Sequence, residues 1–148
     1  MFKIGIVENF HKDGIKLLED HPNFQYEIID DVSKENLIKE LPKFDGLTLR
    51  VAKLGSEVLS KCKKLKVISR HGVGYDNVDL NHLKKNNITL LITATANAVA
   101  VAEHVMYMML SLSKGVTLYD SEVRSGNFKK NANKIETYEL YKKEILIA

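Results

Sequence analysis

Residues 65–80 have the sequence LKVISRHGVGYDNVDL, in which a short apolar segment leads directly into a turn that contains two glycines. The apolar, β-branched segment 65–69 predicts a strand. Residues 80–85, which follow the turn, predict a helix. A strand, a turn and a helix in this order form the unit from which parallel sheets are built, so the rest of the chain decides how many such units there are.

The same alternation of strand and helix runs from the N-terminus to residue 92. Strands are predicted at 2–7, 24–29, 46–49, 65–69 and 88–92, and helices at 11–20, 31–41, 56–62 and 80–85. Five strands that alternate with helices favour an α/β fold with a parallel sheet covered on both faces. Right-handed crossovers leave few strand orders, and the flavodoxin-like order is the commonest of them.

The chain changes character after residue 96. Residues 97–114, NAVAVAEHVMYMMLSLSK, predict a long helix that is apolar on nearly all sides and therefore buried on more than one face. Residues 115–137 are polar and lose the alternation, and the final YELYKKEILIA, 138–148, ends like the beginning of a buried strand. We therefore expect a first domain at 1–96, a linking helix at 97–114 and the opening of a second domain at 115–148.

The composition excludes several classes of protein. The 148 residues carry a net charge of +3, from 22 basic and 19 acidic side chains, and the basic ones are scattered, so no nucleic-acid partner is expected. The longest apolar stretch is interrupted by Glu103 and His104, which argues against a membrane span. One cysteine permits no disulfide framework and suits a cytoplasmic protein. The five histidines show no metal-ligand spacing, so no metal site is expected.

Ligands of parallel sheets bind at the carboxyl ends of the strands, so the residues after each strand are the candidates for function. They are Glu8, Arg50, 70–76 and 93–97. Arg50 follows the third strand and Arg70 ends the fourth, so two cations are expected on one rim, where arginine suits a carboxylate or phosphate. The alternative interpretation is two solvated arginines.

The turn Gly72–Gly74, with Val73 at its centre, could bring a ligand close to the backbone and offer it free N–H groups. A merely tight turn would also explain the two glycines. The dinucleotide fingerprint G-x-G-x-x-G is absent here because Asn77 stands at the third glycine position.

The other ionisable residues near these segments have ordinary structural explanations. Asp76 and Asp79 are interpreted as turn and cap residues. Glu103 lies within the apolar helix, where a carboxylate needs a partner. His71 and His104 are single histidines that more often pack than act as bases.

Three segments together resemble the D-isomer-specific 2-hydroxyacid dehydrogenases, nearest to the D-3-phosphoglycerate dehydrogenase branch. They are LKVISRHGVGYDNVDL at 65–80, the linking helix NAVAVAEHVMYMMLSLSK at 97–114, and VRSGNF at 123–128 followed by YELYKKEILIA. Phe128 departs from the pattern because the family usually has tryptophan there. The resemblance covers the whole chain.

The resemblance implies an oxidoreductase that transfers a hydride between NAD or NADP and a small 2-hydroxy or 2-oxo acid, with a 3-phosphoglycerate-like substrate favoured and a homodimer expected. Arg50 and Val51 match a substrate loop, and Gly72, Val73 and Gly74 match the turn that holds the substrate carboxylate. Arg70 matches a position for a phosphate, and Val73 and Val101 match positions near the nicotinamide. Residues 115–148 would then be the start of a Rossmann domain, ending with its first strand.

The family's catalytic arginine, acid and histidine have no match in residues 1–148, so no catalytic residue is assigned here. The chain stops before the family's glycine-rich cofactor loop, so the resemblance implies a chain that is inactive alone. In the family a C-terminal segment returns to the first domain, so we also expect that domain to be incomplete here. The alternative is a stand-alone, non-catalytic α/β module that binds anions and lacks a cofactor domain.

Overall fold

A computed structural model describes residues 1–131 and 135–147 of the chain. It separates into two compact units, Met1–Thr95 and Ala96–Ala148. Each unit is described by itself below, and the candidate rim lies entirely in the first.

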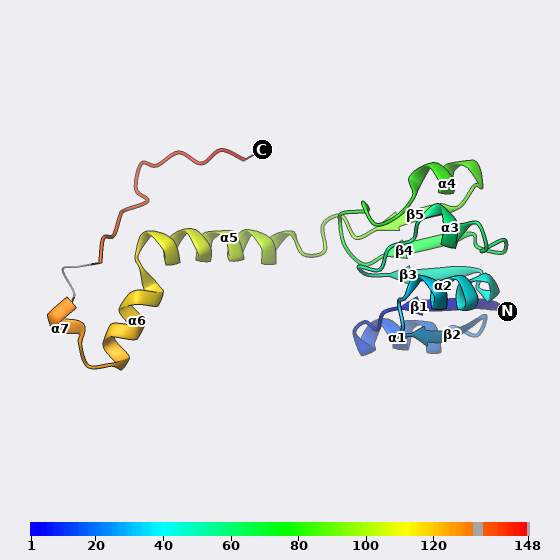
Figure 1. Cartoon of the computed structure of the whole chain (residues 1–148), viewed down its shortest axis with the longest axis horizontal. Coiled ribbons are helices and arrows are strands. Elements are labelled where there is room, and N and C mark those ends of the chain that lie inside the picture. The colour runs from blue at the N-terminus through cyan, green and yellow to red at the C-terminus, as the bar shows by residue number, and fades with distance from the viewer. Residues whose placement is uncertain (132–134, 148) are drawn as a thin grey trace. The chain divides into compact units, whose positions relative to one another are not determined.

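The first unit is built on a five-stranded parallel sheet (Figure 1). Its strands are β1 (Phe2–Val7), β2 (Phe24–Ile29), β3 (Gly46–Leu49), β4 (Val67–Arg70) and β5 (Thr89–Ile92). The order β2-β1-β3-β4-β5 confirms the flavodoxin-like prediction. Val7 pairs with Leu49, Leu49 with Arg70, and Arg70 with Ile92, so β1, β3, β4 and β5 end in one row and the residues that follow them gather at one edge.

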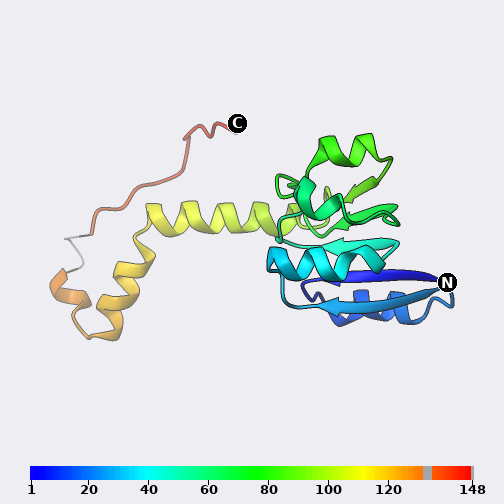
Figure 2. The same ribbon diagram turned by 45° about the vertical axis from the view of Figure 1, so that its right-hand side comes forward.

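Helices lie along the crossovers of the sheet and are visible from two directions in Figures 1 and 2. These helices are α1 (Lys12–Glu19), α2 (Lys34–Glu40), the 3₁₀ turn η1 (Leu41–Lys43), α3 (Ser56–Leu59) and α4 (Leu80–Lys85). Leu37, Val58 and Leu83 from α2, α3 and α4 are buried in one cluster with Leu49 and Ile68 of the sheet. By contrast, α1 contributes no buried residue. On the sheet face opposite the cluster, Leu91 is 53% exposed.

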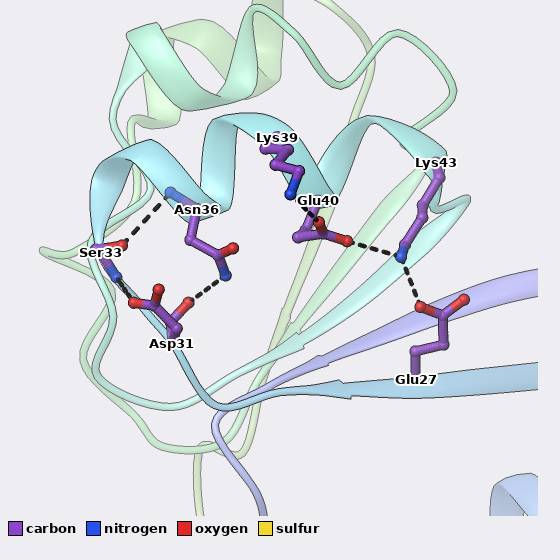
Figure 3. Close-up of polar contacts among 7 residues, drawn as sticks. All are labelled: Glu27, Asp31, Ser33, Asn36, Lys39, Glu40 and Lys43. Atoms are coloured by element: carbon purple, nitrogen blue, oxygen red, sulfur yellow. Dashed lines mark hydrogen bonds and ion pairs between the residues drawn. The ribbon is translucent and has the colours of Figure 1, made fainter.

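Polar contacts fix the beginning of α2 (Figure 3). The Ser33 hydroxyl accepts a bond from the Asn36 N–H at 3.4 Å, which makes Ser33 the N-cap of the helix. The Asp31 carboxylate accepts from the Ser33 N–H at 2.9 Å, and the Asn36 amide donates to the Asp31 carbonyl at 2.7 Å. The chain therefore enters α2 through a loop closed by its own side chains.

The second unit begins with α5 (Ala98–Ser113), as expected, but the predicted burial of this helix is wrong for this chain. Val99 is 72% exposed and Leu112 is 82% exposed, and Ser113 is the only buried residue of α5. Glu103 is exposed too, so it is not a buried carboxylate in need of a partner. Apolar composition indicates that a helix can be covered, but it does not supply the covering element.

Two further helices, α6 (Val116–Arg124) and α7 (Phe128–Asn131), lie in the polar segment 115–137, for which the sequence predicted no element. Gly115 adopts a left-handed conformation, φ 59°, and separates α5 from α6. Within α6 the Arg124 side chain donates to the Asp120 carboxylate at 2.8 Å, an i,i+4 pair that supports a short polar helix. Residues 132–134 of the polar segment 115–137 lie outside the described residues.

The predicted strand at the end of the chain does not form within 145–147. Ile145, Leu146 and Ile147 are 58%, 92% and 91% exposed and belong to no sheet, because an isolated extended segment has no neighbour to bond with. Ala148 lies outside the described residues. The helices of the described residues are all too short or too polar to cross a membrane.

Candidate functional site

The candidate site is the edge at which β3 and β4 end side by side. Leu49, the last residue of β3, pairs with Arg70, the last residue of β4, and Arg50 follows immediately. The His71 N–H donates to the Leu49 carbonyl at 2.7 Å and extends the ladder past the strands. Arg50 directly after β3 and Arg70 at the end of β4 therefore lie at the same edge of the sheet, as the sequence predicted.

Arg50, Val51 and Ala52 form a short loop after β3. Because Arg50 and Val51 are predicted to contact the substrate, we call it the substrate loop. The carboxylate of Glu8, the residue after β1, accepts hydrogen bonds from the Val51 N–H at 2.7 Å and the Ala52 N–H at 2.8 Å. The Arg50 guanidinium is exposed and donates to the Asn9 carbonyl at 3.3 Å. Glu8 was named in sequence only as a residue that follows a strand, so its partners are a structural finding.

Asn77 connects the substrate loop to the segment that follows the glycine turn. Its side-chain amide donates to the Ala52 carbonyl at 2.9 Å and to the Arg50 carbonyl at 3.3 Å. Its own carbonyl accepts from the Leu54 N–H at 2.8 Å. In sequence, Asn77 attracted notice only because it replaces a fingerprint glycine, and its role in this connection was missed.

Arg70 and Gly72 fit closely together. Gly72 has φ 148°, and a Cβ added there would collide with Nη1 of the Arg70 guanidinium. The Nε atom of Arg70 is buried and has no hydrogen-bond partner, and Arg70 forms no ion pair among the described residues. A buried donor without a partner is costly, and the half-buried Arg70 guanidinium is therefore suited to receive an anion.

The glycine turn offers fewer free donors than the resemblance implies. The Gly72 N–H donates to the Arg70 carbonyl at 3.0 Å, and the Gly72 carbonyl accepts from the Thr93 N–H at 3.1 Å. The exposed Val73 and Gly74 make no backbone N–H bond within the part of the chain that the structure describes. Two backbone donors, rather than three, are thus available for a carboxylate.

The acids near the site behave as structural residues. Asp79 caps α4 by accepting from the His82 N–H at 2.9 Å, which confirms its interpretation as a cap. Asp76 is exposed in the turn. The described residues contain no group of three His, Cys, Asp or Glu side chains that could hold a metal ion.

The two histidines also pack against aromatic rings. The His71 ring meets the Phe10 ring edge-on, with centroids 6.5 Å apart. His71 also lines a largely apolar cavity of about 320 Å³, whose walls are Phe10, His11, Gly14, Thr48, Ser69, His71 and Thr93. In the second unit, the His104 ring stacks on Tyr107 at 6.1 Å. Neither histidine has a carboxylate partner among the described residues.

The predicted cofactor contacts, Val73 and Val101, belong to different units. Val73 is 45% exposed in the glycine turn, and Val101 is 51% exposed on α5. Exposed apolar side chains of this kind fit a nicotinamide ring, whereas the described residues include no glycine-rich loop leading into a helix that would fit a pyrophosphate. That both valines lie near the cofactor stays a prediction.

Comparison with known proteins shows the relationship. Residues 4–145 match the family model described as D-isomer specific 2-hydroxyacid dehydrogenase, catalytic domain. The chain is 31% identical over 140 residues to D-3-phosphoglycerate dehydrogenase of Methanocaldococcus jannaschii, covering 93% of this chain and 26% of that protein. It is 28% identical over 134 residues to hydroxypyruvate reductase of Thermotoga maritima, covering 90% and 44%.

Among solved structures, the fold resembles NAD⁺-bound 3-phosphoglycerate dehydrogenase of Entamoeba histolytica, with a TM-score of 0.67 and 26% identity over 74% of this chain and 38% of that one. The chain thus spans a quarter to less than half of the length of these relatives. The family match extends over nearly all of the described residues, including both arginines and the glycine turn. This chain therefore belongs to the D-isomer specific 2-hydroxyacid dehydrogenase family, of whose catalytic domain it forms a part.

Proposed function

We propose that the chain is the substrate-binding part of an NAD-dependent oxidoreductase that transfers a hydride between NAD and a D-2-hydroxy acid. The observation that carries the proposal is the unpaired guanidinium of Arg70, whose buried Nε has no partner. Membership of the dehydrogenase family supports the reaction class. The chain alone is inactive in this proposal, because none of its residues matches the family's catalytic arginine, acid or histidine.

The favoured substrate resembles 3-phosphoglycerate. Such a molecule carries a carboxylate and a phosphate, and the rim offers two arginines and the free N–H groups of Val73 and Gly74. In our proposal the turn and Arg50 hold the carboxylate end, and Arg70 holds the phosphate. Relatives named phosphoglycerate dehydrogenase support this substrate, whereas the one named hydroxypyruvate reductase favours a smaller acid without phosphate.

NAD supplies the hydride acceptor or donor when it is bound. In our proposal this chain orients the substrate carboxylate at the glycine turn. The exposed side chains of Val73 and Val101 are proposed to contact the nicotinamide end of the cofactor. We further propose that the intact protein is a homodimer, since α5 carries many exposed apolar side chains that association would bury. Light scattering of the intact protein tests this part: a monomer contradicts it.

The test is steady-state kinetics of the intact protein and its Arg70→Met variant. Wild type should oxidise 3-phosphoglycerate with NAD, as followed by nicotinamide absorbance. The KM of Arg70→Met for 3-phosphoglycerate should rise by about 10-fold or more, because a charge-assisted contact is lost. Its KM for glycerate, which has no phosphate, should change by less than about 2-fold.

Arg124→Met is the matched control, because its guanidinium forms an exposed pair with Asp120 in the second unit and contributes little. Equal KM changes for glycerate and 3-phosphoglycerate would contradict the phosphate role of Arg70. Absence of turnover of any 2-hydroxy or 2-oxo acid with NAD or NADP in the intact protein would contradict the proposed reaction. Turnover by the 148-residue chain alone would contradict its inactivity.

A further inference from the structure

The substrate loop is held by side chains from two sides. From one side, a single oxygen of Glu8, Oε2, accepts from the N–H groups of Val51 and Ala52. From the other side, the Asn77 amide donates to the carbonyls of Arg50 and Ala52. Val51 is 70% exposed, so burial does not fix the centre of the loop. The four side-chain bonds therefore determine its conformation.

Glu8 is itself held in a conformation that is uncommon for its residue type. Its φ is 65°, in the left-handed region that disfavours side chains with a Cβ. A residue keeps such a backbone conformation where several surrounding contacts stabilise it. Here the Glu8 N–H donates to the Ile29 carbonyl at 3.1 Å, and the carboxylate makes its two bonds to the substrate loop.

The segment after β1 also contacts the guanidinium that the loop carries. Arg50 donates from Nη1 to the carbonyl of Asn9, the neighbour of Glu8. The Arg50 side chain and the N–H groups of the next two residues, Val51 and Ala52, are thus bonded to the same short segment. Asn77 bonds the loop to the chain that follows the glycine turn. Glu8 forms no ion pair with Arg50 among the described residues, so the guanidinium keeps its charge for a ligand.

We propose that Glu8 and Asn77 are positioning residues, which set the direction of the Arg50 guanidinium toward a substrate anion held at the glycine turn. The inference rests on the proposed function, and it adds two residues that touch no substrate themselves. Since Glu8 occupies the N–H groups of Val51 and Ala52, these two groups are not available to the anion, and the loop's charged donor is the Arg50 side chain.

The kinetic test uses the intact protein with 3-phosphoglycerate and NAD. Glu8→Ala should raise the KM for 3-phosphoglycerate by about 10-fold, with kcat within about 2-fold, because the contact binds substrate and transition state alike. Asn77→Asp, which cannot donate to the two carbonyls, should act in the same direction. Glu8→Gln should keep the wild-type KM to within about 2-fold, because one amide oxygen can accept both bonds.

Glu8→Gly guards against a folding artefact. Glycine adopts φ 65° without strain but has no acceptor, so its KM should rise as in Glu8→Ala while the fold is kept. A double-mutant cycle gives the decisive readout: in an Arg50→Ala background, Glu8→Ala should raise KM no further. A full additional increase, or an unchanged KM in Glu8→Gly, would overturn the positioning role.

Amide hydrogen exchange of the 148-residue chain separates the inference from the proposed function. Exchange at Val51 and Ala52 should accelerate at least about 10-fold in Glu8→Ala and remain slow in Glu8→Gln. Unchanged exchange overturns the inference whatever the enzyme does. If exchange responds but the intact wild-type protein turns over no 2-hydroxy acid, the proposed function fails and the substrate-positioning role falls with it, although the contacts themselves stand.

Discussion

At the scale of single residues, Gly72 shows how a missing side chain makes room for a functional one. The Nη1 atom of Arg70 occupies the space that a Cβ at position 72 would need, and φ 148° is rare for any other residue. The glycine pattern alone predicted a close approach of a ligand to the backbone. The structure adds that part of the vacant space is filled by the cation proposed to bind the ligand.

Gly72→Ala should therefore lower the free energy of unfolding by about 1–3 kcal/mol, through backbone strain and displacement of the guanidinium. Gly74→Ala is the matched comparison for stability, because no atom lies within 4 Å of the added methyl group. Urea denaturation of both variants measures the difference. Equal free energies of unfolding for the two variants would show that the Arg70 side chain can move away from the added methyl group without loss of stability.

The only cysteine illustrates a different effect of surroundings. Cys62 is buried at 3% exposure in the core cluster, and its thiol donates to the Val58 carbonyl at 3.5 Å. Burial raises the pKa of the Cys62 thiol from 9.0 to about 11, because the thiolate would lose its solvation. As the pH rises above 9.0, the thiol of the unfolded chain loses its proton while that of the folded chain keeps it, so the free energy of unfolding falls.

Cys62 should accordingly react very slowly with iodoacetamide in the folded chain. At about pH 8 a thiol with this pKa is only about one part in a thousand thiolate, and the core also excludes the reagent. Unfolding in urea should restore the ordinary rate, and mass spectrometry measures both. Rapid alkylation without denaturant would mean that the core opens around Cys62.

At the scale of elements, charged side chains form contacts at the start of α2 and just beyond its end (Figure 3). At its start, the Ser33 N–H bond lowers the pKa of the Asp31 carboxyl below its ordinary 3.8, with the Ser33 hydroxyl as a second cause. Just beyond its end, Lys43 lies between Glu27 at 2.6 Å and Glu40 at 2.8 Å. This lysine lowers the pKa of Glu40, and its own pKa is raised, first by Glu27.

A carboxyl group whose pKa is lowered by folding stabilises the folded chain at pH values above its pKa in the unfolded chain. This stabilisation is lost as the pH falls through the pKa of the group in the folded chain. Asp31→Asn should therefore lose less stability than wild type when pH is lowered below 3.8, while an amide oxygen still accepts the Ser33 bond near neutrality. Thermal denaturation over a pH series checks this. Asp20→Asn, which removes a carboxylate without a partner among the described residues, is the matched control, and a pH profile equal to that of Asp31→Asn would contradict the role of the Asp31 bond.

The elements also show what could be predicted from the sequence. β1, β3, β4 and β5 were predictable because each contains a short apolar run, and β2 because its residues alternate between apolar and polar. Alternation with helices restricts the strand order. Helix α6 was missed because its support, the pair Arg124–Asp120, lies in a polar segment without a long apolar period. The contact of Glu8 with Val51 spans 43 positions, and no local pattern reports such a pairing.

At the scale of the whole chain, the two units differ in how they are stabilised. The buried apolar core belongs entirely to Met1–Thr95, whereas Ser113 is the only buried residue among those described in Ala96–Ala148. The exposure of α5 could not be foreseen, because its apolar sequence does not reveal which surface covers it. Stability should therefore reside in the first unit.

A chain of residues 1–95 should fold with a Tm within about 4 °C of that of the 148-residue chain, which corresponds to less than about 1 kcal/mol. Circular dichroism during thermal denaturation measures both. The shorter chain should also aggregate less, since it lacks the exposed apolar residues of α5. A much lower Tm would show that the second unit contributes to the stability of the sheet.

The parallel strand order has a consequence for how the chain reaches this fold. Two parallel neighbours cannot be joined by a tight turn, so each ladder must wait until a crossover of many residues has closed. β1 stands between β2 and β3, and all three lie within the first 49 residues. On the ribosome, this half of the sheet can assemble while β4 and β5 are still being synthesised. Among these five strands, β1 precedes both of its neighbours in the chain, so the order of synthesis allows β2 and β3 to pair with it as each emerges.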